Sequence, residues 1–225
     1  MKDLVIDGES VLYFLSSLSD EIGEEAANNV LKTARNILQR APEITSSNEK
    51  VLGLLYGLIQ SGKTNIINMT IALSTDNGYK LAIVLTDRNN SLQTQTFERA
   101  DEAITGMLVR KIDEISEEDP DFIKTILESD GIVLICKKDP ADLDKLITFL
   151  RNYLSVSPSP SLIIDDEADA IGLNTNQRME GENPSPINQQ LLTLRELAPS
   201  HLFLQVTATP QAIILQNREE GGVLP

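Results

Sequence analysis

Residues 57–64, GLIQSGKT, have the types and the spacing that bind phosphate groups. In such a loop, backbone N–H groups and the positive end of the following helix surround the anion. Lys63 is expected to reach the β- and γ-phosphates of a nucleotide, and the Thr64 hydroxyl to bind Mg²⁺. The predicted phosphate-binding residues are Gly57, Gln60, Ser61, Gly62, Lys63 and Thr64. A glycine turn beside a lysine is the alternative interpretation.

Two adjacent acids follow an apolar run in SLIIDDEADA, residues 161–170. Open α/β sheets bind ligands at the carboxyl ends of their strands, where these acids would lie. Asp166 is expected to hold Mg²⁺, and Glu167 to orient and deprotonate an attacking water. With Lys63 they form the predicted catalytic group. The alternative is a helix whose first turn is acidic, since such turns favour Asp and Glu.

A third motif, VTATP at residues 206–210, places Thr207 and Thr209 at the end of an apolar run. Small hydroxyl side chains beside the strand with the acids would sense the γ-phosphate. A strand that leaves into a proline turn explains the same residues.

These motifs need strands and helices that alternate. Short apolar runs predict strands at residues 51–56, 80–86, 131–137, 161–165 and 201–209. Helical spacing predicts helices at about 63–75, 91–116, 119–129 and 140–154. The pattern is typical of the α/β class, with a mostly parallel sheet flanked by helices.

The first forty residues have a different pattern. Val30, Leu31, Ala34 and Leu38 recur at helical spacing, and a polar connector follows at residues 43–50. We expect a helical N-terminal extension at residues 1–48 and one ATPase domain at residues 49–225. A breaker-rich stretch at residues 174–190 predicts a surface loop.

Charge and cysteine usage narrow the class of protein. The formal net charge of −15 disfavours independent, tight binding of a polyanion, although a local basic groove is compatible with it. One cysteine, Cys136, excludes an internal disulfide and a cysteine-based metal site. No apolar run approaches the length of a membrane span, and the N-terminus does not resemble a signal peptide, so we expect a cytoplasmic protein.

The three motifs, GLIQSGKT, DEAD at residues 166–169 and TAT at 207–209, resemble motifs I, II and III of superfamily-two helicases and translocases. More narrowly, GLIQSGKTNIINM, IVLTDRNNSLQTQTFER, VLICKK and LIIDDEADAIGLN resemble the prokaryotic Z-one domain, an ATPase domain associated with restriction endonucleases and phage defence. The resemblance spans about residues 50–215 and implies a RecA-like P-loop NTPase core that uses ATP and Mg²⁺.

The resemblance also implies roles for individual residues. Asp169, Thr207 and Thr209 match contacts that couple motifs II and III. Asn90, Gln95 and Thr96 fall in the segment with which the family touches a nucleic acid backbone. The family usually has an arginine where Gln93 stands, and this departure argues against strong strand contact.

Superfamily-two motors close two RecA-like domains around ATP, and the second domain supplies arginine fingers. We therefore expect a second RecA-like domain outside this sequence, weak hydrolysis by this part alone, and DNA and a nuclease domain or subunit as partners. A protein-interaction switch that binds ATP but moves no nucleic acid is the competing hypothesis, and the negative charge favours it. An inactive nucleotide fold is disfavoured because motifs I and II are intact.

Overall fold

A single parallel sheet forms the centre of the protein. The computed structural model describes residues 2–57, 62–154, 159–168 and 186–209. Within them, six strands follow the order β1-β6-β5-β2-β4-β3, and all five neighbouring pairs are parallel. The strands are β1 (Lys50–Tyr56), β2 (Leu81–Thr86), β3 (Leu108–Lys111), β4 (Ile132–Lys137), β5 (Ser161–Asp165) and β6 (His201–Thr207). The predicted α/β class with a mostly parallel sheet is confirmed.

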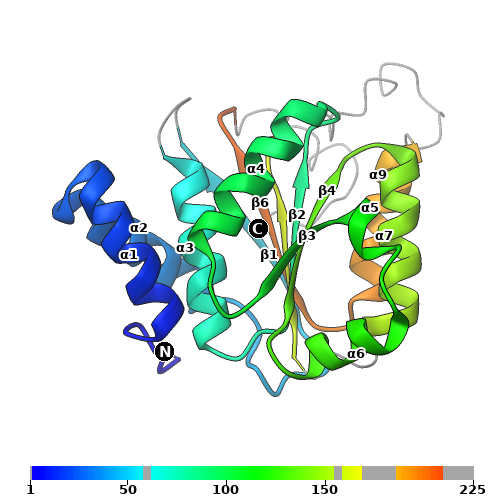
Figure 1. Cartoon of the computed structure of the whole chain (residues 1–225), viewed down its shortest axis with the longest axis horizontal. Helices are drawn as coiled ribbons and strands as arrows, with labels where there is room; N and C mark the ends of the chain where they lie inside the picture. Colours follow the sequence, from blue (N-terminus) through cyan, green and yellow to red (C-terminus); the bar gives the residue numbers. More distant parts are fainter. Residues whose placement is uncertain (1, 58–61, 155–158, 169–185, 210–225) are drawn as a thin grey trace.

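Helices cover both faces of this sheet (Figure 1). The helices on one side are α1 (Glu9–Ile22), α2 (Glu24–Leu38), α3 (Lys63–Asp76) and α4 (Asn90–Ala103). Those on the other are α5 (Ile112–Ile115), α6 (Pro120–Glu128), α7 (Pro140–Tyr153) and α9 (Pro186–Leu197). In Figure 1, α7 and α9 lie at the right-hand edge of the molecule, α6 at the bottom, and α1 and α2 at the left-hand edge.

The strands are apolar throughout because each faces a core on both sides. Successive side chains of a strand point to opposite faces. In β2, Ala82 and Val84 join the core beneath α3 and α4, whereas Ile83 and Leu85 join the core beneath α7. All four side chains are fully buried. This two-sided burial fixes the register of the strands and therefore the level at which each strand ends.

Helix α3 is covered on two sides, since the sheet lies on one side and α1 and α2 pack on the other. Eight consecutive residues from Ile67 to Ser74 are buried, a pattern typical of a central helix. Its last residue, Asp76, accepts hydrogen bonds from the backbone N–H groups of Ser10 (3.1 Å) and Val11 (2.9 Å). The carboxylate lies where a Cβ on Gly8 would be, 2.3 Å from its Cγ, so only glycine fits there. The end of α3 thus caps the start of α1.

Two segments depart from the sequence prediction. The single helix expected at residues 91–116 is wrong: α4 ends at Ala103, and β3 and α5 follow. Gly106, with φ +81°, makes the turn between α4 and β3. The loop expected at 174–190 is wrong for residues 186–190, which begin α9; residues 174–185 lie outside the described part. The N-terminal helical segment is two helices, divided at Gly23 (φ +88°).

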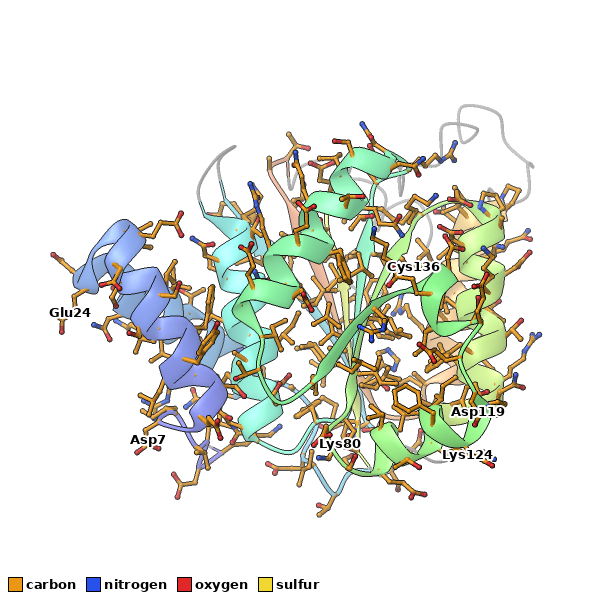
Figure 2. All side chains as sticks on the ribbon, viewed as in Figure 1. Asp7, Glu24, Lys80, Asp119, Lys124 and Cys136 are labelled. Carbon is orange, nitrogen blue, oxygen red and sulfur yellow. The ribbon has the colours of Figure 1, made fainter. Side chains whose placement is uncertain are left out.

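The side chains of Cys136 and His201 are buried in the core. Cys136 is fully buried in β4, and Figure 2 shows it in the interior. His201 is 1% exposed, and its Nδ1 lies 2.7 Å from the carbonyl oxygen of Ala198. Burial lowers the pKa of His201. Within the residues that the structure describes, no helix is long and apolar enough to cross a membrane.

Candidate functional site

A cleft of about 840 Å³ opens at the carboxyl ends of the strands. Its walls include seven of the residues singled out from the sequence: Gly62, Lys63, Thr64, Asp166, Glu167, Thr207 and Thr209. These residues come from three separate segments, which follow β1, β5 and β6. Three further predicted residues, Gln60, Ser61 and Asp169, lie outside the described residues. The structure thus gathers residues of all three motifs around one cleft, whereas the predicted residue Gly57 is not among those that line it.

Sheet order explains how the motifs meet. Strand β6 lies between β1 and β5, so the TAT segment stands between the end of β1 and the acids. The backbone N–H of Gly57 donates to the carbonyl oxygen of Thr207 (3.2 Å) and extends the β1–β6 ladder by one residue. The expected position of the TAT segment beside the strand with the acids is the one observed.

The start of α3 has the backbone shape of an anion-binding helix terminus. Gly62 precedes the helix in the left-handed conformation, with φ +76° and ψ 22°. A side chain there would strain the backbone, because L-residues rarely adopt positive φ. Lys63 begins the helix, and its Nζ donates a hydrogen bond to the carbonyl oxygen of Gly57 (3.1 Å). The amine therefore joins the start of α3 to the residue that follows β1.

The two acids form a tight turn after β5. The N–H of Asp166 donates to the carbonyl oxygen of Leu85 at the end of β2 (3.0 Å), and the N–H of Glu167 donates to the Asp166 carboxylate (3.1 Å). Glu167 has φ +54°, the only positive φ among the described non-glycine residues. Such a conformation costs of order 1–3 kcal/mol and often marks a functional site.

Asp166 is the acid with the perturbed ionisation. Burial, the charge of Glu167 and the charge of Asp165 raise its pKa from 3.8 to about 6, against the effect of a hydrogen bond from Glu167 and the charge of Lys138. Negative charge is therefore concentrated at this end of the cleft. A divalent cation would relieve it, because an opposite charge favours the ionised form of a carboxyl group.

Sequence reasoning missed Lys138, which lies directly beneath the acids. Its side chain is fully buried, and its Nζ forms an ion pair with Asp165 (2.8 Å). The same Nζ donates to the carbonyl oxygens of Asp166 (2.7 Å) and Glu167 (3.0 Å). The available signal was a pair of lysines, Lys137 and Lys138, at the end of an apolar run. Because the carboxyl ends of parallel strands meet at one edge of the sheet, these lysines lie at the same edge as the acids.

At the end of β6, one threonine organises the turn. The Thr207 hydroxyl accepts a hydrogen bond from the backbone N–H of Thr209 (2.9 Å). Thr207 is 1% exposed. Its hydroxyl therefore fixes the path of the TAT segment along the cleft wall.

The other end of the cleft was not predicted from the sequence. It is lined by residues of α1, α3 and α4, namely Phe14, Ser17, Glu21, Asn68, Arg99, Glu102 and Ala103. The Asn68 side-chain amide donates to the carbonyl oxygen of Arg99 (3.2 Å) and joins α3 to α4. The first N-terminal helix, α1, thus contributes to the wall of the cleft.

The three residues expected to touch nucleic acid are all on α4, away from the cleft lining. Asn90 and Gln95 are exposed and Thr96 is half-buried. Their spacing spreads them around the helix rather than along one face. The side-chain Oδ1 of Asn90 accepts a hydrogen bond from Lys137 Nζ (2.9 Å). Gln93 is buried, and its amide donates to the carbonyl oxygen of Ile135 (3.4 Å), so it faces the sheet.

Comparison with known proteins gives distant structural similarity. No protein-family model and no curated protein matches the sequence. Among solved structures, the genome packaging NTPase of Sulfolobus turreted icosahedral virus 2, in complex with AMP, is 12% identical with a TM-score of 0.37, over 72% of this chain and 66% of that one. The Hef helicase domain of Pyrococcus furiosus is 18% identical with a TM-score of 0.41, over 84% of this chain and 37% of that one. The roles of the cleft residues therefore rest on the cleft itself.

Proposed function

We propose that the protein binds and hydrolyses a nucleoside triphosphate, ATP, with Mg²⁺. One observation carries this proposal: Lys63 and Thr64 line the same cleft as Asp166 and Glu167, although the two pairs are far apart in the sequence. If residues 57–64 were only a glycine turn beside a lysine, or the acids only the start of a helix, nothing would require the two motifs to line the same cleft. Their convergence favours the phosphate-binding interpretation of both motifs.

The cleft residues divide into phosphate-binding and water-activating groups. The Gly62 and Lys63 backbone at the start of α3, together with the Lys63 amine, would bind the phosphates. The amine would exchange its bond to the Gly57 carbonyl oxygen for a phosphate oxygen. Glu167 would accept the proton of the attacking water, because it is the exposed acid of the pair.

The residues present fit a magnesium site that the substrate completes. Mg²⁺ is usually held by one or two carboxylates and the phosphates of a nucleotide rather than by a cage of protein ligands. The described residues contain no cluster of three or more His, Cys, Asp or Glu side chains that would hold a metal alone. Asp166 and Thr64 would hold the ion, which would neutralise charge on the phosphates.

We further propose that the domain is the first of two RecA-like domains in a superfamily-two translocase of the Z-one type, acting on DNA in restriction or phage defence. The support is the order and spacing of the three motifs and the place of the TAT segment between them. The second domain and a nuclease would lie outside this sequence.

An ATP-dependent interaction switch is the second candidate. Two large apolar side chains of α1 are exposed, Leu12 at 53% and Tyr13 at 50%, and the net charge is strongly negative. Both features suit a protein partner better than a nucleic acid. ATPase assays with and without DNA or RNA distinguish the two candidates, since only a translocase should be stimulated.

Nucleotide binding is tested with a fluorescent ATP analogue. Lys63→Ala is expected to abolish binding or weaken it at least about a hundredfold, because it removes a charge-assisted contact to the phosphates. Lys124→Ala is the matched control: Lys124 lies on α6 at the rim of the molecule (Figure 2) and pairs with Asp121. Unchanged affinity in the Lys63 variant would refute the site.

Turnover is tested separately from binding. Glu167→Gln keeps the size of the side chain but removes its basic oxygen, so binding should persist while hydrolysis stops. Glu118→Gln, at an exposed acid before α6, is the control. A Glu167 variant that hydrolyses ATP at the parental rate would remove this side chain from the mechanism.

A further inference from the structure

Lys138 has no direct access to the cleft, yet all the polar contacts of its side chain converge on the acidic turn. The side chain is fully buried, so it touches neither solvent nor a ligand. An ammonium group has three N–H donors. Here they match three acceptors: the Asp165 carboxylate and the carbonyl oxygens of Asp166 and Glu167.

The place of Lys138 in the sheet shows how it reaches the turn. Lys138 follows β4, whereas the acids follow β5, and β2 lies between these strands. The backbone N–H of Lys138 donates to the carbonyl oxygen of Thr86, the last residue of β2 (2.9 Å). From there the side chain crosses the end of β2 and meets the turn from below.

Stability alone gives little reason for a charged pair at this position. Burying an ammonium and a carboxylate costs several kcal/mol per ion, and apolar replacements of similar volume are often equally stable. The lysine does something that an apolar side chain cannot do: it binds two consecutive carbonyl oxygens. With both carbonyls turned toward the interior, Glu167 takes its left-handed conformation, and both acidic side chains line the cleft.

We propose that Lys138 is a positioning residue for the acidic turn: it holds the carbonyl oxygens of Asp166 and Glu167 so that their carboxylates face the phosphate-binding cleft. This inference rests on the proposed function of that cleft. It predicts that loss of the amine impairs the step that needs the carboxylates, while the phosphate loop keeps its affinity for the nucleotide.

The decisive variant is the double substitution Lys138→Met with Asp165→Leu. The single change Lys138→Met removes the ammonium group that neutralises the buried Asp165 carboxylate and is expected to lower the melting temperature. The double change replaces the ion pair with two apolar side chains and restores a neutral interior. It still removes the Lys138 ammonium donor from the carbonyl oxygens of Asp166 and Glu167. The double variant thus separates positioning from charge balance.

For the double variant, we expect the ATP dissociation constant to stay within about threefold of the parent, and single-turnover hydrolysis to fall about a hundredfold, the usual effect of misplacing a reacting group by about 1 Å. Lys137→Met is the matched control. Lys137 is the neighbouring lysine, pairs with Asp139 and Asp142 instead, and does not line the cleft. This control should hydrolyse ATP at the parental rate.

A second measurement needs no nucleotide. Amide hydrogen exchange at Asp166 and Glu167 should be faster in the double variant, because the turn loses its clamp, and unchanged in Lys137→Met. If the parental protein neither binds nor hydrolyses ATP, the proposed function fails, while the exchange rates still decide whether Lys138 holds the turn.

The proposal would be overturned if the double variant hydrolysed ATP at the parental rate and its amide hydrogens at Asp166 and Glu167 exchanged at the parental rates. Loss of the fold in the double variant would overturn it too, because the amine would then serve folding rather than the orientation of the acids. Parental ATP turnover together with faster amide exchange in the double variant would also count against the proposal, since the carboxylates would then act without the hydrogen bonds from Lys138.

Discussion

Replacing Asp166 with asparagine should stabilise the protein that lacks Mg²⁺ and nucleotide. Burial and the charge of Glu167 raise the pKa of Asp166 from 3.8 to about 6, so ionising it is harder in the folded protein than in the unfolded chain. A difference of about two pKa units corresponds to about 3 kcal/mol at neutral pH. Asparagine carries no charge, and its oxygen can accept the hydrogen bond that the N–H of Glu167 donates to Asp166 (3.1 Å).

The pH dependence of this gain tests the cause. The folded state binds more protons than the unfolded state between pH 3.8 and about 6, so the stability of the parental protein falls as the pH rises through this window. The gain from Asp166→Asn should be about 3 kcal/mol at pH 7 and under about 1 kcal/mol at pH 4. Urea unfolding in EDTA at the two pH values measures it.

The control for this experiment is Asp130→Asn, at an exposed acid in the turn before β4, which should change stability by less than about 0.5 kcal/mol. An Asp166 variant no more stable than the parent at pH 7, or a gain of equal size at pH 4, would refute the reasoning. The same variant should lose ATP turnover, because an amide is a poor ligand for Mg²⁺. Stability and function would then be opposed at one residue.

Two further substitutions test the parts that support the cleft. Leu18→Ala in α1 removes a side chain that is 1% exposed and should cost about 3 kcal/mol in urea unfolding, whereas Leu12→Ala, 53% exposed, should be nearly neutral; equal costs would contradict the packing of α1 on α3. Gly62→Ala places a side chain at φ +76° with no atom within 4 Å, so backbone strain alone should cost about 1 kcal/mol. Asparagine tolerates this conformation better than alanine, so Gly62→Asn should be less destabilised than Gly62→Ala. If both variants had the melting temperature of the parent, backbone strain at this position would be excluded.

The sequence predicts the central strands and the cleft residues better than it predicts the edge strand β3 and the buried contacts of Lys138. A parallel sheet buried on both faces needs continuous apolar runs such as LAIVLT, and these are easy to recognise. The ends of such strands meet at one edge, so residues placed there come together without knowledge of side-chain contacts. Lys63 and Glu167 were therefore found from the motifs alone.

The edge strand β3 could not be found in this way. It is four residues long, and only Val109 is buried among them. Ile104, Ile112 and Ile115 recur at a spacing that also suits a helix, and the prediction therefore continued α4 through this segment. The glycine at position 106 was the available signal for a break.

Lys138 was missed for a different reason. A lysine after a strand is usually solvated, and burial of its amine depends on acceptors from another strand that lies two places away in the sheet. Sequence spacing holds no information on that contact, because it arises from the order of the strands.

The position of β1 at the edge of the sheet has a consequence for synthesis of the chain. Its partner in the described sheet is β6, which pairs Lys50 with His201, so about 150 residues must be made after β1 before it can find its neighbour. At the usual 5–20 residues per second, this takes on the order of ten seconds. Throughout that time the ribosome carries an apolar segment with unpaired amides, which chaperones or other nascent chains can engage. The segment that follows β1 is thus translated well before the strand beside which it comes to lie.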